Sequence, residues 1–176
     1  MNHQEDWERA ATAYHEAGHA VIRHVLGFTP QSVTIISKYD EDGVLQYANP
    51  LRGIKQLATD GSSDRAFLRL MKAIQISYAG PLAQRKYSEH SWQEFHGALD
   101  FQKIEELSLR ACGSSAQAGA FKHWLEMATQ EMIEVHWPAI ERVAKLLLGH
   151  DRLSGVGVSA LFQPRRHLGG RVFGGK

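Results

Sequence analysis

The chain has 176 residues, a formal net charge of +1 at neutral pH and one cysteine, Cys112. These values fit a single globular domain, and they exclude an internal disulfide framework and the strong positive charge typical of nucleic-acid-binding proteins. No stretch approaches the ~18 apolar residues of a membrane-spanning helix, and the acidic N-terminus differs from a secretory signal. We therefore expect a cytoplasmic protein without a membrane segment.

The predicted elements begin with a helix over residues 5–27, in which apolar residues recur at three- and four-residue spacing. Gly27, followed by Pro30, predicts the end of this helix. The β-branched residues of segment 32–37 predict a strand, and segment 44–49 alternates as a return strand after a turn. Because a lone hairpin is marginally stable in water, we expect this pair to pack against the helices.

Three further helices are predicted after the strands. The first spans residues 63–87, and Pro81 should kink or interrupt it because proline cannot donate a backbone hydrogen bond. The second spans residues 99–111. The third spans residues 116–149 and should divide at Pro138, which suits the first turn of a new helix.

These elements predict a mainly α fold (α+β), with helices packed as a bundle. A small β-hairpin or sheet should pack beside the first helix. Residues 1–162 are expected to form one domain, whereas residues 163–176 are basic and glycine-rich. That composition favours a flexible tail.

The first predicted helix contains His15-Glu16-Ala17-Gly18-His19, which has the form His-Glu-x-x-His. Residues four apart lie on the same face of a helix, so His15 and His19 can hold one metal ion, and paired imidazoles suit Zn²⁺. Glu16 lies about 100° further round the helix, where it can take a proton from a water molecule as general base. Peptide hydrolysis is the chemistry typical of such a site. The alternative is that both histidines are solvated or packed in the core.

Two neighbouring residues of this motif lead to separate expectations. A glycine inside a helix costs about 1 kcal/mol relative to alanine, so Gly18 predicts the close approach of another element. His24 lies about 180° from His15 on the helix and should face away from the metal. Ile22 and Val25 occupy the glycine and third-histidine positions of the longer metalloprotease pattern, so that pattern is absent. A third ligand must therefore come from elsewhere in the chain.

Several segments occur in the order found in a known family. They read "TAYHEAGHAVI", "SVTIISKYDEDGVLQYANP", "ISYAGPLAQRKY" and, near the C-terminus, "AIERVAKLLLGHDRLSG". Over residues 8–162 the chain resembles the protease domain of the FtsH-type ATP-dependent zinc metalloproteases. The resemblance implies a zinc metallopeptidase fold and a Zn²⁺ cofactor.

The third zinc ligand of that family is the aspartate of a Gly-Ala-x-x-Asp segment. The matching segment here is Gly97-Ala98-Leu99-Asp100, which is one residue shorter. The resemblance implies that Asp100 is the third ligand, and the first turn of a helix also favours a carboxylate there. The alternatives are that Asp100 only caps its helix and that His90, Glu94 or His96 binds the metal instead.

The leading functional prediction is a zinc-dependent metalloendopeptidase that cleaves unfolded or flexible protein segments. The family carries membrane helices and an AAA+ ATPase, whereas this sequence contains neither a membrane-spanning run nor a Gly-x-x-x-x-Gly-Lys-Ser/Thr loop. We therefore expect ATP-independent cleavage or substrate delivery by a separate ATPase. The family's hexameric rings make a homo-oligomer the assembly to test. Two alternatives stay open: a degenerate module that binds peptides or regulates a protease, and a His-Glu-x-x-His protease of another family that cleaves a specific regulator.

Overall fold

The computed structural model describes residues 3–29, 32–36, 64–89 and 97–162. It confirms a mainly helical fold with a small antiparallel sheet. The elements in chain order are α1 (His3–Val25), β1 (Ser32–Thr34), α2 (Asp64–Tyr87), α3 (Ala98–Ala111), α4 (Ser115–His150), β2 (Arg152–Ser154) and α5 (Gly155–Ala160).

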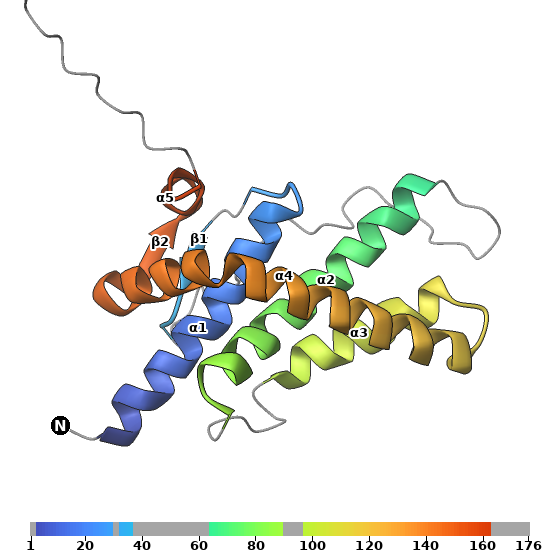
Figure 1. Ribbon diagram of the computed structural model, residues 1–176, viewed down its shortest axis with the longest axis horizontal. Coiled ribbons are helices and arrows are strands. Elements are labelled where there is room, and N and C mark those ends of the chain that lie inside the picture. Colours follow the sequence, from blue (N-terminus) through green and yellow to red (C-terminus); the bar gives the residue numbers. More distant parts are fainter. Residues whose placement is uncertain (1–2, 30–31, 37–63, 90–96, 163–176) are drawn as a thin grey trace, which may run out of the picture.

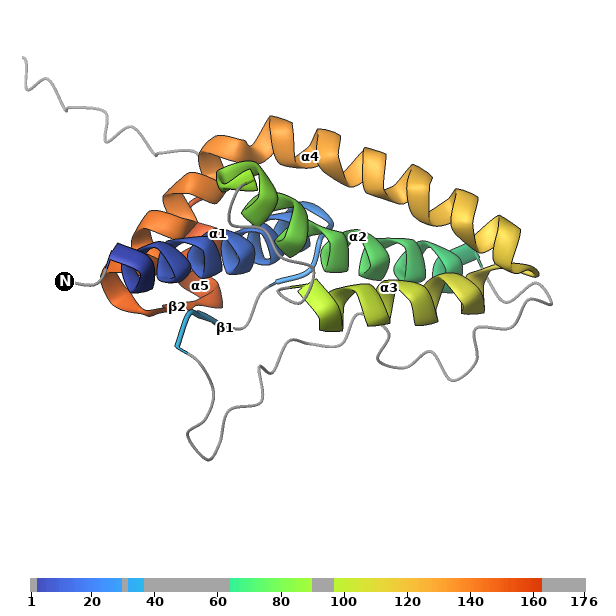
Figure 2. The same ribbon diagram turned by 90° about the horizontal axis from the view of Figure 1, so that it is seen from below.

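Helices α1, α3 and α4 pack against α2, whereas α5 lies beside β2 (Figure 1). In the second view, the long helix α4 runs along one side of α1 and α2, whereas α3 lies on another side of α2 (Figure 2). This arrangement brings the N-terminal end of α3 toward the middle of α1, although about eighty residues separate them in sequence. Residues from α1, α2 and α3 can therefore meet in one site.

Two apolar clusters hold this arrangement together. The larger one joins α1, β1, α2, α4 and α5, and its fully buried members include Val21, Ile22, Val33, Ile140 and Val158. The smaller one joins α2, α3 and α4, and it includes Leu70, Ile74, Ile104, Leu107 and Leu125. Both clusters use one apolar stripe of each helix, as the spacing of apolar residues predicts.

Neither of the two prolines interrupts its helix. Pro81 lies inside α2 and Pro138 lies inside α4, and both helices continue past them. The predicted division of residues 116–149 is therefore wrong, and so is an interruption of α2. A proline removes one backbone hydrogen bond and crowds the preceding turn. Buried apolar residues on both sides of each proline, such as Ile133 and Ile140 in α4, keep each helix packed against the core.

The small antiparallel sheet joins β1 to a strand near the C-terminal end of the described chain. β1 pairs antiparallel with β2, and Val33 lies opposite Leu153. The predicted return strand at 44–49 lies outside the described residues, as does the predicted tail at 163–176. β2 and α5 were not predicted at all. β1 nevertheless packs beside the first helix as expected, because Val33 belongs to the same cluster as Val21.

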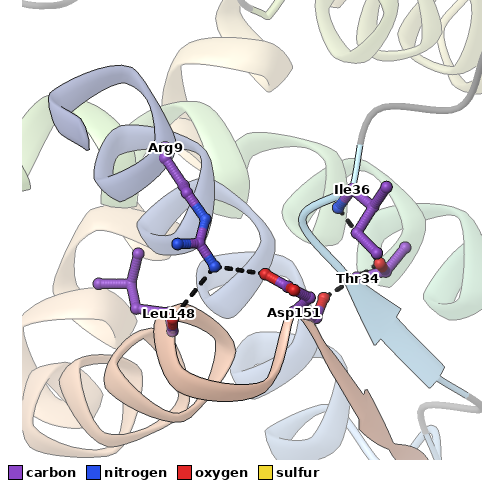
Figure 3. A network of polar contacts seen from close by, with 5 residues as sticks. All are labelled: Arg9, Thr34, Ile36, Leu148 and Asp151. Atoms are coloured by element: carbon purple, nitrogen blue, oxygen red, sulfur yellow. Dashed lines mark hydrogen bonds and ion pairs between the residues drawn. The ribbon is translucent and has the colours of Figure 1, made fainter. Parts of the chain in front are cut away.

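A polar network fixes the corner between α4 and β2 (Figure 3). Asp151 caps α4 in the left-handed conformation, with φ of 59°, and its N–H donates to the Leu147 carbonyl at 2.8 Å. Arg9 of α1 donates to the Leu148 carbonyl at 3.1 Å and forms an ion pair with Asp151. Thr34 donates its hydroxyl to the Asp151 carbonyl at 3.1 Å. The N-terminal half of α1, the end of α4 and β1 are thus joined at one point.

Candidate metal centre

The centre starts from the contact between α1 and α2, which depends on Gly18. A Cβ added at Gly18 would lie 2.4 Å from the Ala79 carbonyl oxygen and 2.6 Å from the Ala83 Cβ. No real Cβ comes this close to a backbone oxygen, so only glycine allows the two helices to pack at this distance. The predicted close approach at Gly18 is confirmed.

Three potential metal ligands meet beside this contact. His15 and His19 lie one turn apart on α1, and Asp100 lies in the first turn of α3. The two Nε2 atoms are 3.1 Å apart. Asp100 Oδ2 lies 3.2 Å from His15 Nε2 and 3.3 Å from His19 Nε2. One nitrogen from each imidazole and one carboxylate oxygen therefore form a small, nearly equilateral triangle.

The size of this triangle matches a tetrahedral zinc site. Nitrogen and oxygen ligands at ~2.0–2.2 Å from a tetrahedral Zn²⁺ lie about 3.3 Å from one another. The observed edges of 3.1, 3.2 and 3.3 Å are close to that value. The donor set, two imidazoles and one carboxylate, is also one that Zn²⁺ accepts in catalytic sites with a fourth position open to water.

The remaining nitrogen of each imidazole has its own partner on α2. His19 Nδ1 lies 2.7 Å from the Ile76 carbonyl oxygen, and His15 Nδ1 lies 3.0 Å from Gln84 Oε1. Carbonyl oxygens only accept hydrogen bonds, so in both contacts Nδ1–H donates. The proton on Nδ1 leaves the Nε2 lone pair of each neutral ring directed toward the other two donor atoms. Such outer hydrogen bonds orient metal-ligating histidines in known metal sites.

Gly80 lies between these two partners on the same face of α2. A Cβ added there would lie 2.3 Å from His19 Nε2 and 2.7 Å from His15 Nε2. The residue therefore has to be glycine if both imidazoles are to keep their positions. Ile76, Gly80 and Gln84 are spaced four residues apart, so one stripe of α2 supplies the two hydrogen-bond partners and the space between them.

The charges of the three groups are coupled. Burial raises the pKa of the Asp100 carboxyl, but the two imidazoles outweigh this effect and hold its pKa well below the ordinary value. Burial alone would lower the pKa of His19, yet the Asp100 charge and hydrogen bond, with Glu16 and the Ile76 carbonyl, raise it to about 9. The pocket therefore stabilises positive charge at the point where the three donor atoms meet. A bound cation would supply that charge without a proton on His19.

Glu16 follows His15 on α1 and is half-buried. His15 and Glu16 both line a surface pocket of about 260 Å³, which continues along α1 past Thr12 and Ala11 to Trp7 and Glu8 and is bounded by Gln84 on α2. The two residues central to the predicted chemistry thus share an accessible pocket. Their side chains are within reach of a molecule bound there.

The structure brings His15, His19 and Asp100 together as one group, which is the arrangement expected from the sequence. Gly97 is the N-cap residue of α3 and no side-chain hydrogen bond caps the helix there, whereas the Asp100 carboxylate lies beside both imidazoles. The other candidate ligands, at positions 90, 94 and 96, lie outside the described residues. His24 stacks on Phe162 with ring centroids 4.2 Å apart and takes no part in the group, as expected.

Three contributors to the centre were missed by sequence reasoning: the Ile76 carbonyl, Gly80 and Gln84. A backbone carbonyl has no sequence signature. The available signal was the four-residue spacing of Gly80 and Gln84 on a helix that also carries small residues, since that spacing places both on one stripe.

None of the protein families compared with the chain matches it, and none of the curated proteins does. The resemblance to the FtsH-type protease domain therefore stays a proposal. Within the described residues, no helix combines the length and apolar character needed to cross a membrane.

Proposed function

We propose that this chain is a zinc-dependent metallopeptidase, in which His15, His19 and Asp100 hold Zn²⁺ and Glu16 is the catalytic acid–base residue. The observation that carries the proposal is the triangle of three donor atoms with edges of 3.1–3.3 Å, the size that a tetrahedral zinc site requires. The motif resemblance to the FtsH-type protease domain supports the same assignment.

Zn²⁺ at this position would lower the pKa of a water molecule and polarise a peptide carbonyl. The chain's own residues supply the rest of the chemistry. Glu16, adjacent in sequence to a ligand and lining the same pocket, accepts the proton of the attacking water. It then returns this proton to the leaving amine, so that one carboxyl serves as base and acid in turn. Gln84 and the Ile76 carbonyl accept hydrogen bonds from Nδ1–H of the two imidazoles, which holds each ring with its Nε2 atom toward the metal position.

The shape of the pocket favours flexible substrates. It opens at the surface beside Glu16 and follows α1. A folded protein would have to unfold locally to place a backbone carbonyl there, whereas an extended segment can enter directly. We therefore propose that the substrates are unfolded or flexible protein segments.

The test compares the wild-type protein with Glu16→Gln, using casein as an unstructured substrate. Glutamine keeps the size of the side chain but cannot take a proton, so cleavage should fall at least about 1,000-fold. Zinc content should stay at one ion per chain because Glu16 is not a ligand. Glu131→Gln is a matched control, since Glu131 is exposed on α4, and it should cleave casein at the wild-type rate.

Two results would contradict the proposal. The first is a zinc-loaded wild-type protein that cleaves neither casein nor a library of unstructured peptides, which would favour a degenerate binding module. The second is undiminished cleavage by Glu16→Gln. Separately, wild-type zinc affinity in Asp100→Ala would show that another residue is the third ligand while leaving the reaction class intact.

A further inference from the structure

The pocket beside the metal centre has a second end, which the chemistry proposed above does not use. His15 and Glu16 line its inner end, and Trp7 and Glu8, two turns earlier on α1, line its outer end. Ala11 and Thr12 line the pocket between these two ends. A substrate with its scissile bond beside Glu16 would therefore place one neighbouring side chain along this part of α1.

The walls of the outer end have a defined chemistry. Glu8 provides a carboxylate there and Glu16 provides a second one at the inner end, and the described residues that line the pocket include no lysine or arginine. The nearest arginine on α1, Arg9, is bound to Leu148 and Asp151 at the α4 corner (Figure 3). Trp7 is 38% exposed, so part of its indole is accessible. An indole face attracts ammonium and guanidinium groups through the charge distribution of its ring.

We infer that this pocket is a specificity subsite for a lysine or arginine side chain of the substrate. The aliphatic part of such a side chain would lie along Ala11, and its charged end would meet Glu8 and the Trp7 indole. Long cationic side chains combine an apolar stem with a charged head in this way. The inference rests on the proposed peptidase function, since it assigns substrate preference to the same site.

The test uses two fluorogenic peptides that differ only in one residue next to the scissile bond, lysine in one and norleucine in the other. Norleucine has nearly the same length and shape as the lysine stem but carries no charge. We expect the wild-type protein to cleave the lysine peptide with kcat/KM about tenfold higher or more, as an added charged hydrogen bond and cation–π contact would give. Glu8→Gln should reduce this ratio to below about threefold, and Trp7→Leu should reduce it partly.

Glu131→Gln removes one exposed carboxylate that does not line the pocket and should keep the wild-type ratio. Thermal unfolding of each variant shows whether a lost preference reflects a lost fold. Equal cleavage of the two peptides by the wild-type protein would overturn the subsite. So would an unchanged ratio in Glu8→Gln.

Failure of the peptidase proposal gives a different pattern. If the zinc-loaded wild-type protein cleaves neither peptide, the proposed reaction is wrong. The binding affinities of the two peptides, measured by fluorescence anisotropy, then test the subsite by themselves. Preferential binding of the lysine peptide that is lost in Glu8→Gln would then support the cationic subsite alone. Equal or undetectable affinity would overturn it.

Discussion

Gly80→Ala tests whether the space left by α2 allows the metal centre to form. The new Cβ would lie 2.3 Å from His19 Nε2 and 2.7 Å from His15 Nε2. Non-bonded heavy atoms normally stay about 3.5 Å apart, so the ring ends would have to move by about 1 Å. Zinc–ligand distances tolerate only about 0.2 Å. We therefore expect zinc affinity to fall at least about 100-fold, which is the upper end of the loss seen when outer partners of metal ligands are removed.

The same substitution should leave the fold intact. Alanine gains up to about 1 kcal/mol over glycine inside a helix, and the clashing atoms are the ends of side chains that can rotate. Zinc affinity would be measured by competition with a chromophoric chelator, and thermal unfolding would be followed with the metal removed. Gly119→Ala is the control, because a Cβ there meets nothing within 4 Å. Wild-type zinc affinity in folded Gly80→Ala would refute the geometry assigned to the centre.

Three further predictions follow from other contacts. Gly18→Ala should lower the free energy of unfolding by more than about 2 kcal/mol, because the new Cβ would lie 2.4 Å from the Ala79 carbonyl oxygen. Chemical denaturation measures this change, and an unchanged free energy of unfolding would contradict the close contact between α1 and α2. Gln84→Ala should weaken zinc binding about 10–100-fold by releasing His15 Nδ1, and an unchanged affinity would show that this hydrogen bond is dispensable. In the metal-free protein, the protonation of His19 stabilises the fold fully below pH 6.5, and this stabilisation is lost as the pH rises toward about 9. The ionisation of Asp100 stabilises the fold above pH 3.8, and this stabilisation is lost as the pH falls below that value. Melting temperature in chelator should therefore be highest between about pH 4 and 6.5, and a constant value from pH 5 to 9 would contradict the coupling.

Features that depend on local spacing were predictable from the sequence. The four-residue separation of His15 and His19 places both on one helix face wherever the helix packs. Gly18 indicated a close helix contact because glycine is unfavourable in a helix unless a neighbour needs the space. The left-handed conformation of Gly27, with φ of 87°, follows from its position just after the last turn of α1.

Features that depend on long-range packing were not predictable in the same way. Local rules predicted a kink or interruption at Pro81 and a division at Pro138, but both helices continue, because burial of the flanking residues against the core outweighs the loss of one hydrogen bond at each. β2 is too short for its sequence to indicate a strand, and it forms because Asp151 turns the chain back toward β1. Asp100 could be proposed only through a family resemblance, since nothing local relates it to a histidine about eighty positions earlier.

The central claim is that three side chains of this protein form one zinc site. X-ray absorption spectroscopy of the zinc-loaded protein measures the number and type of ligands directly. We predict one zinc ion per chain with two imidazole nitrogens and additional oxygen ligands, all at about 2.0–2.2 Å, and the loss of one imidazole in His19→Ala. A protein that binds no zinc, or whose zinc spectrum is unchanged in His19→Ala, would contradict the account.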